Sequence, residues 1–223
     1  MRFSNDLLGP EERLSEFDRF QLFIVAKSPL QRLLSIKELA DVTKSIQIDE
    51  IKRKICPLLG SVCFDQEHVI RQNLASGLLE FSRILLEMKD DSKEAMSIVL
   101  NDVTDWTKSL LKDPSPEVRD ATSITIVEVA KLLSKEVVEE KLIASSIGLM
   151  DSVSDDDVRS SIISTLNDLA PVAGKEISIR ALAPILIKYS VDSSFRLRKA
   201  CSHAFGKIYA TCGSEYAAEK LVH

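Results

Sequence analysis

One short pattern recurs along this chain at a nearly constant spacing, and it dictates a repeat architecture. The stretch SPEVRDATSITIVEVA begins at Ser115, and a related stretch, DDDVRSSIISTLNDLA, begins at Asp155. Serine or aspartate before a helix, proline at its first position and acidic residues in its first turn all favour a helix start. A start that returns at a fixed period indicates repeated units, each burying its apolar face against its neighbours.

Five arginines mark the period of the repeat. They are separated by 39, 48, 40 and 39 residues, and they are Arg32, Arg71, Arg119, Arg159 and Arg198. An apolar residue returns seven positions after each arginine and another returns ten positions after it; the first set is Leu39, Leu78, Ile126, Leu166 and Phe205, and the second is Val42, Phe81, Val129, Leu169 and Ile208. These offsets lie on one helical face, so each arginine marks a helix that buries one apolar stripe.

A second amphipathic segment precedes each of these helices, which makes the unit a helix pair of about 40 residues. Pro57 and Pro184 each stand 14 residues before the arginine of their own repeat, which predicts a bend at the same place in two first helices. The nine additional residues between the second and third arginines fall near the polar stretch LEMKDDSKEAMS, as a longer loop or an extended helix. The predicted repeats span about residues 15–46, 47–87, 92–134, 135–172 and 174–211, with a partial sixth at 213–223 and an N-terminal segment at 1–14.

The units DPSPEVRDATSITIVEVAKLL and DSSFRLRKACSHAFGKI, together with the opening RFQLFIVAKSPLQRLLSIKELADV, resemble HEAT-repeat proteins of the phosphatase-scaffold kind. They are similar to the scaffold and regulatory subunits of protein phosphatase 2A-family enzymes. Two helices in each unit favour HEAT over armadillo repeats. We therefore expect an all-α fold, a right-handed α-solenoid of about five HEAT-like helix pairs plus a partial sixth, as a single domain over residues 15–223.

The resemblance implies that aspartates six residues before the arginines pair with arginines of neighbouring turns. Asp65, Asp113 and Asp192 occupy that position, whereas Ala26 and Val153 replace the aspartate in the first and fourth repeats. Such pairs would stabilise the stack of helices, and they do not act as catalytic acids or bases.

The same resemblance implies that the turns inside the repeats bind partner proteins, namely a phosphatase catalytic subunit and a further regulatory subunit. The candidate partner-binding residues are Asp65, Gln66, Asp113, Pro114, Ser115, Pro116, Asp155, Asp156, Asp192, Ser193, Phe195 and Trp106. Most of them are equally explained as solvated helix caps. The single tryptophan is either a core residue or an exposed anchor at an interface.

Catalytic chemistry finds no support in the sequence. The three histidines, His68, His203 and His223, form neither an HExxH motif nor a His-Glu pair, which argues against the HEAT-type iron hydroxylases. Three consecutive acids from Asp155 are explained by the dipole of the helix that they begin. We expect no catalytic, cofactor-binding or metal-binding residues, and no enzyme activity.

Composition restricts the class of partner and the cellular compartment that we expect for this chain. The net charge of −5 gives no basic footprint for nucleic acid or a membrane surface. The four cysteines form no CxxC pair, which favours reduced, mostly buried thiols, and the longest apolar run, ALAPILI, is too short to span a bilayer. We expect a cytoplasmic or nuclear scaffold subunit of a 2A-family phosphatase. The alternatives are a tubulin-binding module of the TOG kind, disfavoured by the acidic turns, and a transport or chromatin adaptor.

Overall fold

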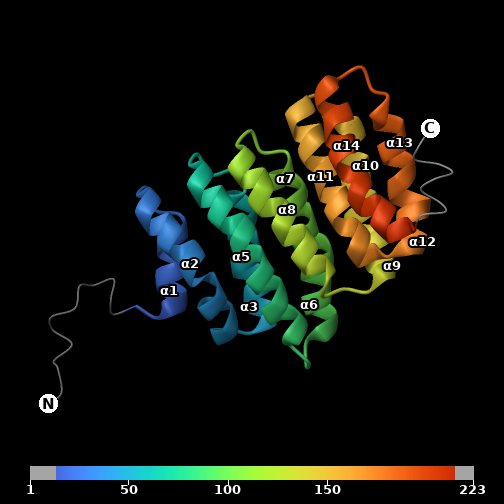
Figure 1. Ribbon diagram of the computed structural model, residues 1–223. Coiled ribbons are helices and arrows are strands. Elements are labelled where there is room, and N and C mark those ends of the chain that lie inside the picture. The colour runs from blue at the N-terminus through green and yellow to red at the C-terminus, as the bar shows by residue number, and fades with distance from the viewer. Residues whose placement is uncertain (1–13, 214–223) are drawn as a thin grey trace, which may run out of the picture. The chain divides into compact units, whose positions relative to one another are not determined.

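The computed structural model describes residues 14–213, and every element in that range is a helix (Figure 1). Two compact units divide the chain between Val103 and Thr104. The predicted segment 1–14, apart from Leu14, and the predicted partial sixth repeat, apart from Gly213, lie outside the described residues. Over the described range no helix is both long and apolar enough to cross a membrane.

The first unit contains two complete helix pairs and the start of a third. Its helices are α1 (Glu16–Ile24), α2 (Pro29–Ser45), α3 (Ile48–Glu50), α4 (Cys56–Val62), α5 (His68–Glu87) and α6 (Ser92–Ile98), with the π-helical segments η3 (Ile51–Ile55) and η4 (Val99–Val103). The second helices of the first two repeats, α2 and α5, pack against each other (Figure 1).

The second unit continues with the same kind of pair. Its helices are α7 (Thr104–Leu111), α8 (Pro116–Ala130), α9 (Lys135–Val137), α10 (Ala144–Ser152), α11 (Asp156–Ala173), α12 (Lys175–Ile177), α13 (Ala183–Ser190) and α14 (Phe195–Cys212), with η5 (Val138–Ile143) and η6 (Ser178–Leu182). The second helices α8, α11 and α14 lie side by side, with α11 in the middle (Figure 1).

The apolar stripes predicted from the sequence form the cores of both units. Leu39, Leu78, Ile126 and Leu166, seven residues after their arginines, are buried. Phe205 at the same offset is only partly buried. Full burial of one such side chain contributes about 1.5–3 kcal/mol. The stripes therefore stabilise each helix against its neighbours.

The longer spacing between the second and third arginines is taken up partly by helix. α5 is 20 residues long, whereas α8, the second helix of the next repeat, is 15 residues long. The other second helices are 15 to 18 residues long, so the longer α5 accounts for part of the added spacing. Only the residues between Glu87 and Ser92 connect α5 to α6.

A π-helical segment occurs at one place in the first helix of the second, third, fourth and fifth repeats. η3, η4, η5 and η6 all end 16 residues before the arginine of their own repeat. Pro57 and Pro184, where the sequence predicts a bend, follow η3 and η6 by two residues. Asp105 and Ser145 stand at the same position after η4 and η5, so the π-helical geometry does not require proline.

Candidate partner-binding edge

The arginine that marks each second helix also fixes the turn before that helix. In four of the five repeats its Nη1 donates to the carbonyl oxygens six and five residues earlier. For Arg119 these acceptors are the carbonyls of Asp113 and Pro114, at 2.7 and 3.0 Å. Hydrogen bonds from a charged donor are stronger than neutral ones, so the turn is held in one conformation.

The carboxylate of the aspartate in each turn accepts a hydrogen bond from a backbone amide of the same turn. Oδ1 of Asp65 accepts a hydrogen bond from the amide of Glu67 at 2.9 Å, and Oδ1 of Asp192 accepts one from Ser194 at 2.8 Å. Asp113 binds the amide of Ser115 in the same way, at 2.9 Å. Each of these hydrogen bonds joins the aspartate to the amide two residues later and so closes the turn.

The fourth repeat, which lacks this aspartate, uses the next acidic residue instead. Asp155 caps α11 by accepting hydrogen bonds from the amides of Asp157 and Val158, at 2.8 and 3.1 Å. Hydrogen bonds from Val158 and Asp157 lower the pKa of Asp155, because they stabilise its charged form.

The implied pairing of arginine with aspartate is confirmed in the first unit. Arg32 binds Asp65 through two parallel bonds, Nε to Oδ2 at 2.6 Å and Nη2 to Oδ1 at 2.9 Å. Burial alone would raise the pKa of Asp65, but the hydrogen bonds from Arg32 and the Glu67 amide outweigh it and lower that pKa. This bidentate pair joins the turns of the first and second repeats.

The pairing weakens in the second unit. Arg159 Nη2 lies 3.9 Å from Asp192 Oδ2, and the Arg159 guanidinium lies 5.1 Å from the centre of the Tyr189 ring. Its buried Nε has no hydrogen-bond partner among the described residues. Because Val153 replaces the aspartate of the fourth repeat, Arg119 Nε donates instead to Ser161 Oγ at 3.0 Å. The pairing is therefore not continuous along the turns of this unit, in line with the replacement of the aspartate by Val153 in the sequence.

The predicted partner-binding residues differ widely in exposure. Gln66, Pro114, Pro116, Asp155, Ser193 and Phe195 are exposed, whereas Asp65, Ser115, Asp156 and Asp192 are partly buried. Phe195 is 69% exposed, and the Arg198 guanidinium lies 5.9 Å from the centre of its ring.

Two of the candidates and one predicted contact need correction. Asp113 and Trp106 are buried, at 6% and 8% exposure, so neither side chain offers a surface to a partner. The tryptophan is thus a core residue rather than an exposed anchor. Ser115 precedes α8 as expected, but its hydroxyl does not cap the helix; it donates to Glu117 Oε2 at 2.6 Å.

The structure reveals exposed apolar side chains on these turns that the sequence prediction missed. In the first unit we call these side chains together the apolar edge, and its members are between 42% and 76% exposed: Val25, Leu30, Leu34, Phe64 and Val69. Phe64 is next to Asp65 in the sequence, and Leu30 and Leu34 stand two residues before and two residues after Arg32, the partner of Asp65. In the second unit, Val191 occupies the same place in its repeat as Phe64 and is 81% exposed.

A signal for these residues was present in the sequence. Val25 and Phe64 stand seven residues before an arginine, Leu30 and Val69 two residues before one, and Leu34 two residues after one. None of these offsets belongs to the buried stripe at positions seven and ten after the arginine. Apolar residues that recur away from the buried face of a helix are candidates for an interaction surface.

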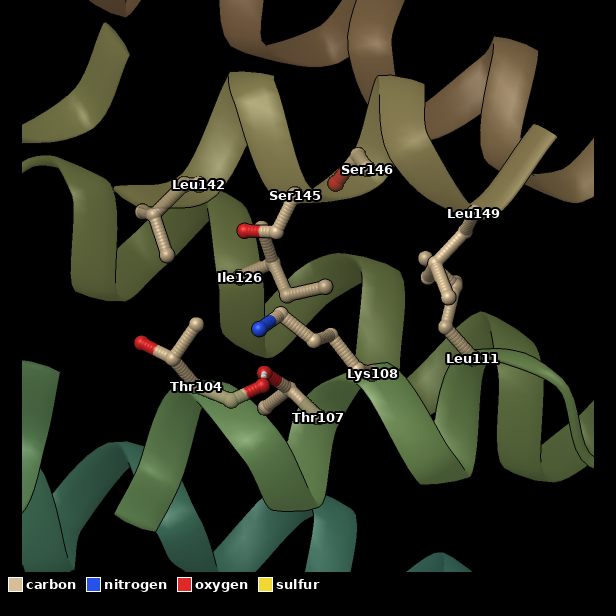
Figure 2. Close-up of a pocket in the computed structure, with 9 residues that line it drawn as sticks. All are labelled: Thr104, Thr107, Lys108, Leu111, Ile126, Leu142, Ser145, Ser146 and Leu149. Atoms are coloured by element: carbon tan, nitrogen blue, oxygen red, sulfur yellow. Dashed lines mark hydrogen bonds between the residues drawn. The ribbon is translucent and has the colours of Figure 1, made fainter. Parts of the chain in front are cut away.

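One cavity of the second unit is too small for a substrate. Figure 2 shows a cavity of about 10 Å³ lined by Thr104, Thr107, Lys108, Leu111, Ile126, Leu142, Ser145, Ser146 and Leu149. That volume accommodates at most about one water molecule. Over residues 14–213 there is also no group of three or more His, Cys, Asp or Glu side chains that could hold a metal ion.

Comparison with known proteins gives relatives in one class. No protein-family model matches the chain. Serine/threonine-protein phosphatase 4 regulatory subunit 1 of Mus musculus and that of Homo sapiens are each 22% identical to it over 207 residues, which cover 91% of this chain. The chain spans 22% of the length of these curated relatives.

Solved structures show the fold. Computationally designed armadillo repeat proteins for modular peptide recognition match with a TM-score of 0.50 and 17% identity, over 93% of this chain and 87% of theirs. An engineered protein matches with a TM-score of 0.51 and 13% identity, over 94% of this chain and 90% of its own. The chain is thus an all-α helical-repeat solenoid of the armadillo and HEAT class, similar in sequence to the regulatory subunit 1 of phosphatase 4.

Proposed function

We propose that this chain is a non-catalytic protein-binding scaffold that acts as a regulatory or scaffold subunit of a serine/threonine phosphatase of the 2A family. Its partners are then a phosphatase catalytic subunit and a further regulatory subunit. The observation that carries the proposal is the apolar edge, in which exposed apolar side chains stand on turns fixed by charged hydrogen bonds. The similarity to phosphatase 4 regulatory subunit 1 supports the class of partner.

Exposed apolar side chains supply the free energy for binding. Covering a fully exposed Leu, Val or Phe side chain contributes about 1.5–3 kcal/mol, and aromatic side chains are frequent hot spots of interfaces. Phe64 and Leu30 are the two most exposed members of the edge. We therefore expect these two to dominate the affinity of the first unit for its partner.

The turns are ordered before a partner arrives. Arg32 holds the carbonyls of Ala26 and Lys27 at 2.9 and 3.0 Å and the carboxylate of Asp65. A surface that is already fixed loses less conformational entropy on binding than a mobile loop does. The clamped turns thus favour a stable, stoichiometric complex.

The charges around the two sets of turns favour different contacts. The Arg32–Asp65 pair neutralises itself at the centre of the apolar edge. In the second unit Glu117 and Asp155 are exposed carboxylates, whereas Asp157 forms an ion pair with Arg196 at 3.3 Å. An apolar segment of the partner suits the first set of turns, and basic side chains suit the second set.

The test measures binding of the purified chain to a purified phosphatase 4 catalytic subunit by calorimetry and size-exclusion chromatography. We expect a one-to-one complex, and we expect Phe64→Asp to weaken it at least tenfold because a carboxylate would be placed in an apolar contact. Ile124→Asp is the matched control, since Ile124 is 64% exposed on α8 and lies away from the turns. Both substitutions replace exposed side chains, so the unfolding temperature should stay unchanged.

Two results would contradict the proposal. One is no complex between the wild-type chain and catalytic subunits of the phosphatase 2A and 4 types. The other is an equal loss of affinity for Phe64→Asp and Ile124→Asp, which would remove the apolar edge from the interface. Stable binding of tubulin by the same purified chain would favour the alternative module of the TOG kind.

A further inference from the structure

Three serines occupy the same position and the same backbone conformation just before a second helix. Ser28, Ser115 and Ser194 each stand four residues before the arginine of their repeat. Their φ and ψ angles are −72° and 120°, −79° and 122°, and −73° and 121°, respectively. All three are therefore extended at the point where the turn meets the helix.

Only two of these serines are followed by proline. Ser28-Pro29 and Ser115-Pro116 are the only Ser-Pro or Thr-Pro dipeptides in the 223-residue sequence, whereas Ser194 is followed by Phe195. Proline directly after the acceptor serine in an extended segment is what proline-directed serine/threonine kinases recognise. The repeat has thus placed both such dipeptides at one structural position.

Both serines are themselves partly buried, but the residues that flank them are exposed. Lys27, Pro29 and Leu30 around Ser28 are exposed, as are Pro114, Pro116 and Glu117 around Ser115. Neither serine hydroxyl caps its helix, so the fold does not use the oxygen atoms for that purpose. The Ser115 hydroxyl donates only to an exposed carboxylate, that of Glu117.

We propose that Ser28 and Ser115 are phosphorylation sites for proline-directed serine/threonine kinases. In this reaction the hydroxyl oxygen forms a bond to the γ-phosphorus of ATP, and the bond between that phosphorus and the β–γ bridging oxygen breaks. The hydroxyl proton passes to a base of the kinase, and ADP leaves. The products are phosphoserine and ADP.

Entry of either serine into a kinase cleft requires the start of its helix to open. The first bonds of the two helices, from the Arg32 amide to the Ser28 carbonyl and from the Arg119 amide to the Ser115 carbonyl, are long, at 3.2 and 3.3 Å. Proline at the first helical position has no amide hydrogen, so opening this turn breaks no hydrogen bond from that residue. The serines themselves need no change from their extended conformation.

The fold already tolerates a negative charge at this position. Glu67 and Asp155 stand four residues before the arginines of the second and fourth repeats, where the other repeats carry serine. A phosphoserine adds a charge of about −1.5 to −2 near neutral pH. Phosphorylation of Ser28 and Ser115 would therefore give the first four repeats an anionic residue at this place.

The two sites differ in their surroundings. The first turn of α2 contains no acidic residue, and Lys27 precedes Ser28, so a phosphate there meets no nearby repulsion in its own helix start. At Ser115 the phosphate would repel the carboxylate of Glu117 and replace an attractive contact. We expect Ser28 to be the more readily modified site.

Phosphorylation of Ser28 would also change the apolar edge, because Leu30 lies only two residues away. A dianion beside an apolar contact has to be desolvated when a partner covers it, so modification should weaken binding. This consequence depends on the proposed function, whereas the modification itself does not.

The experiment incubates the folded chain with Mg²⁺, ATP and, separately, an active mitogen-activated protein kinase and an active cyclin-dependent kinase. Mass spectrometry then locates the phosphate. We expect it on Ser28 and Ser115 and not on Ser194, which is the matched control with the same backbone. Pro29→Ala and Pro116→Ala should each reduce labelling of the preceding serine at least tenfold while leaving the acceptor in place.

Unfolded peptides covering residues 22–36 and 109–123 provide the second control. If both enzymes label the peptides but leave the folded chain unmodified, the proposal is overturned, because the turns are then inaccessible. Equal labelling of Ser194 overturns it as well, because proline would not direct the reaction. No partner protein takes part in the assay, so failure here leaves the proposed phosphatase role untouched, and absence of a phosphatase complex leaves this proposal untouched.

Discussion

In each turn of this chain, single side chains satisfy backbone groups that would otherwise lack partners between two helices. Asp65 uses Oδ1 for both the Glu67 amide and Arg32 Nη2, and it uses Oδ2 for Arg32 Nε. Asp192 keeps the equivalent amide bond but lies 3.9 Å from its arginine. The two aspartates therefore differ chiefly in the strength of the ion pair, which makes them a matched pair for measurement.

Asp65→Asn should lower the free energy of unfolding at pH 7 by about 2 kcal/mol, because it removes charged hydrogen bonds from a mostly buried guanidinium. Asp192→Asn should lower it by less than about 1 kcal/mol, since its pair is long. The folded chain lowers the pKa of Asp65 below 3.8, so the carboxylate stabilises the fold above that pH and loses its effect as the pH falls through the folded value. Urea unfolding at pH 7 and pH 3 checks both points. If the difference in unfolding free energy between wild type and Asp65→Asn were the same at pH 3 as at pH 7, the stabilising role of the ionised Asp65 carboxylate would be contradicted.

At the scale of helices, the π-helical segments are the feature that the sequence predicted least completely. The two prolines indicated an irregular first helix in the second and fifth repeats, and the structure adds the same geometry in the third and fourth repeats. In the fourth repeat the Ser145 hydroxyl donates to the Lys141 carbonyl, four residues earlier. Packing of the repeat imposes the geometry, and packing is not visible in the residues of one helix.

Because the fourth repeat has the same π-helical segment as the two repeats that carry proline, its first helix should tolerate a proline at the same position. Ser145→Pro should cost no more than about 1 kcal/mol of unfolding free energy, because the π-helical segment already avoids the clash that makes an interior proline cost about 3 kcal/mol. Ser164→Pro is the control, since Ser164 is an exposed residue in the middle of α11. Its cost should be about 3 kcal/mol or more. Equal losses in urea unfolding would show that η5 gives no such tolerance.

At the scale of the whole molecule, the period of the arginines predicted the helix pairs, the buried stripes and the solenoid class. The division between Val103 and Thr104 could not be predicted, because it depends on how helices cluster in space and no turn residue marks it. The turns located the candidate edge, but its apolar members stand at offsets that the buried stripe does not mark, and exposure cannot be read from those offsets alone. Asp113 and Trp106 could not be assigned from sequence, since the side of a helix or turn that is covered depends on neighbours far along the chain.

The cysteines allow unfolding of the two units to be followed separately, because each unit contains two of them. All four are free and buried, as expected from the sequence; Cys56 and Cys63 lie in the first unit, and Cys201 and Cys212 lie in the second. Burial raises the pKa of Cys56 and Cys63 to about 12 and that of Cys201 to about 11, because a thiolate would be poorly solvated there.

Iodoacetamide should therefore alkylate Cys56 and Cys63 at pH 8 about a thousandfold more slowly in the folded chain than in urea, since only the thiolate reacts. Because both cysteines belong to the same compact unit, opening of that unit exposes them together, and mass spectrometry should find them modified at the same rate. Cys201 and Cys212 should become reactive at a urea concentration of their own if the second unit opens separately. Rapid alkylation of Cys56 in the native chain would contradict its burial, and a single shared transition for all four thiols would show that the two units unfold as one.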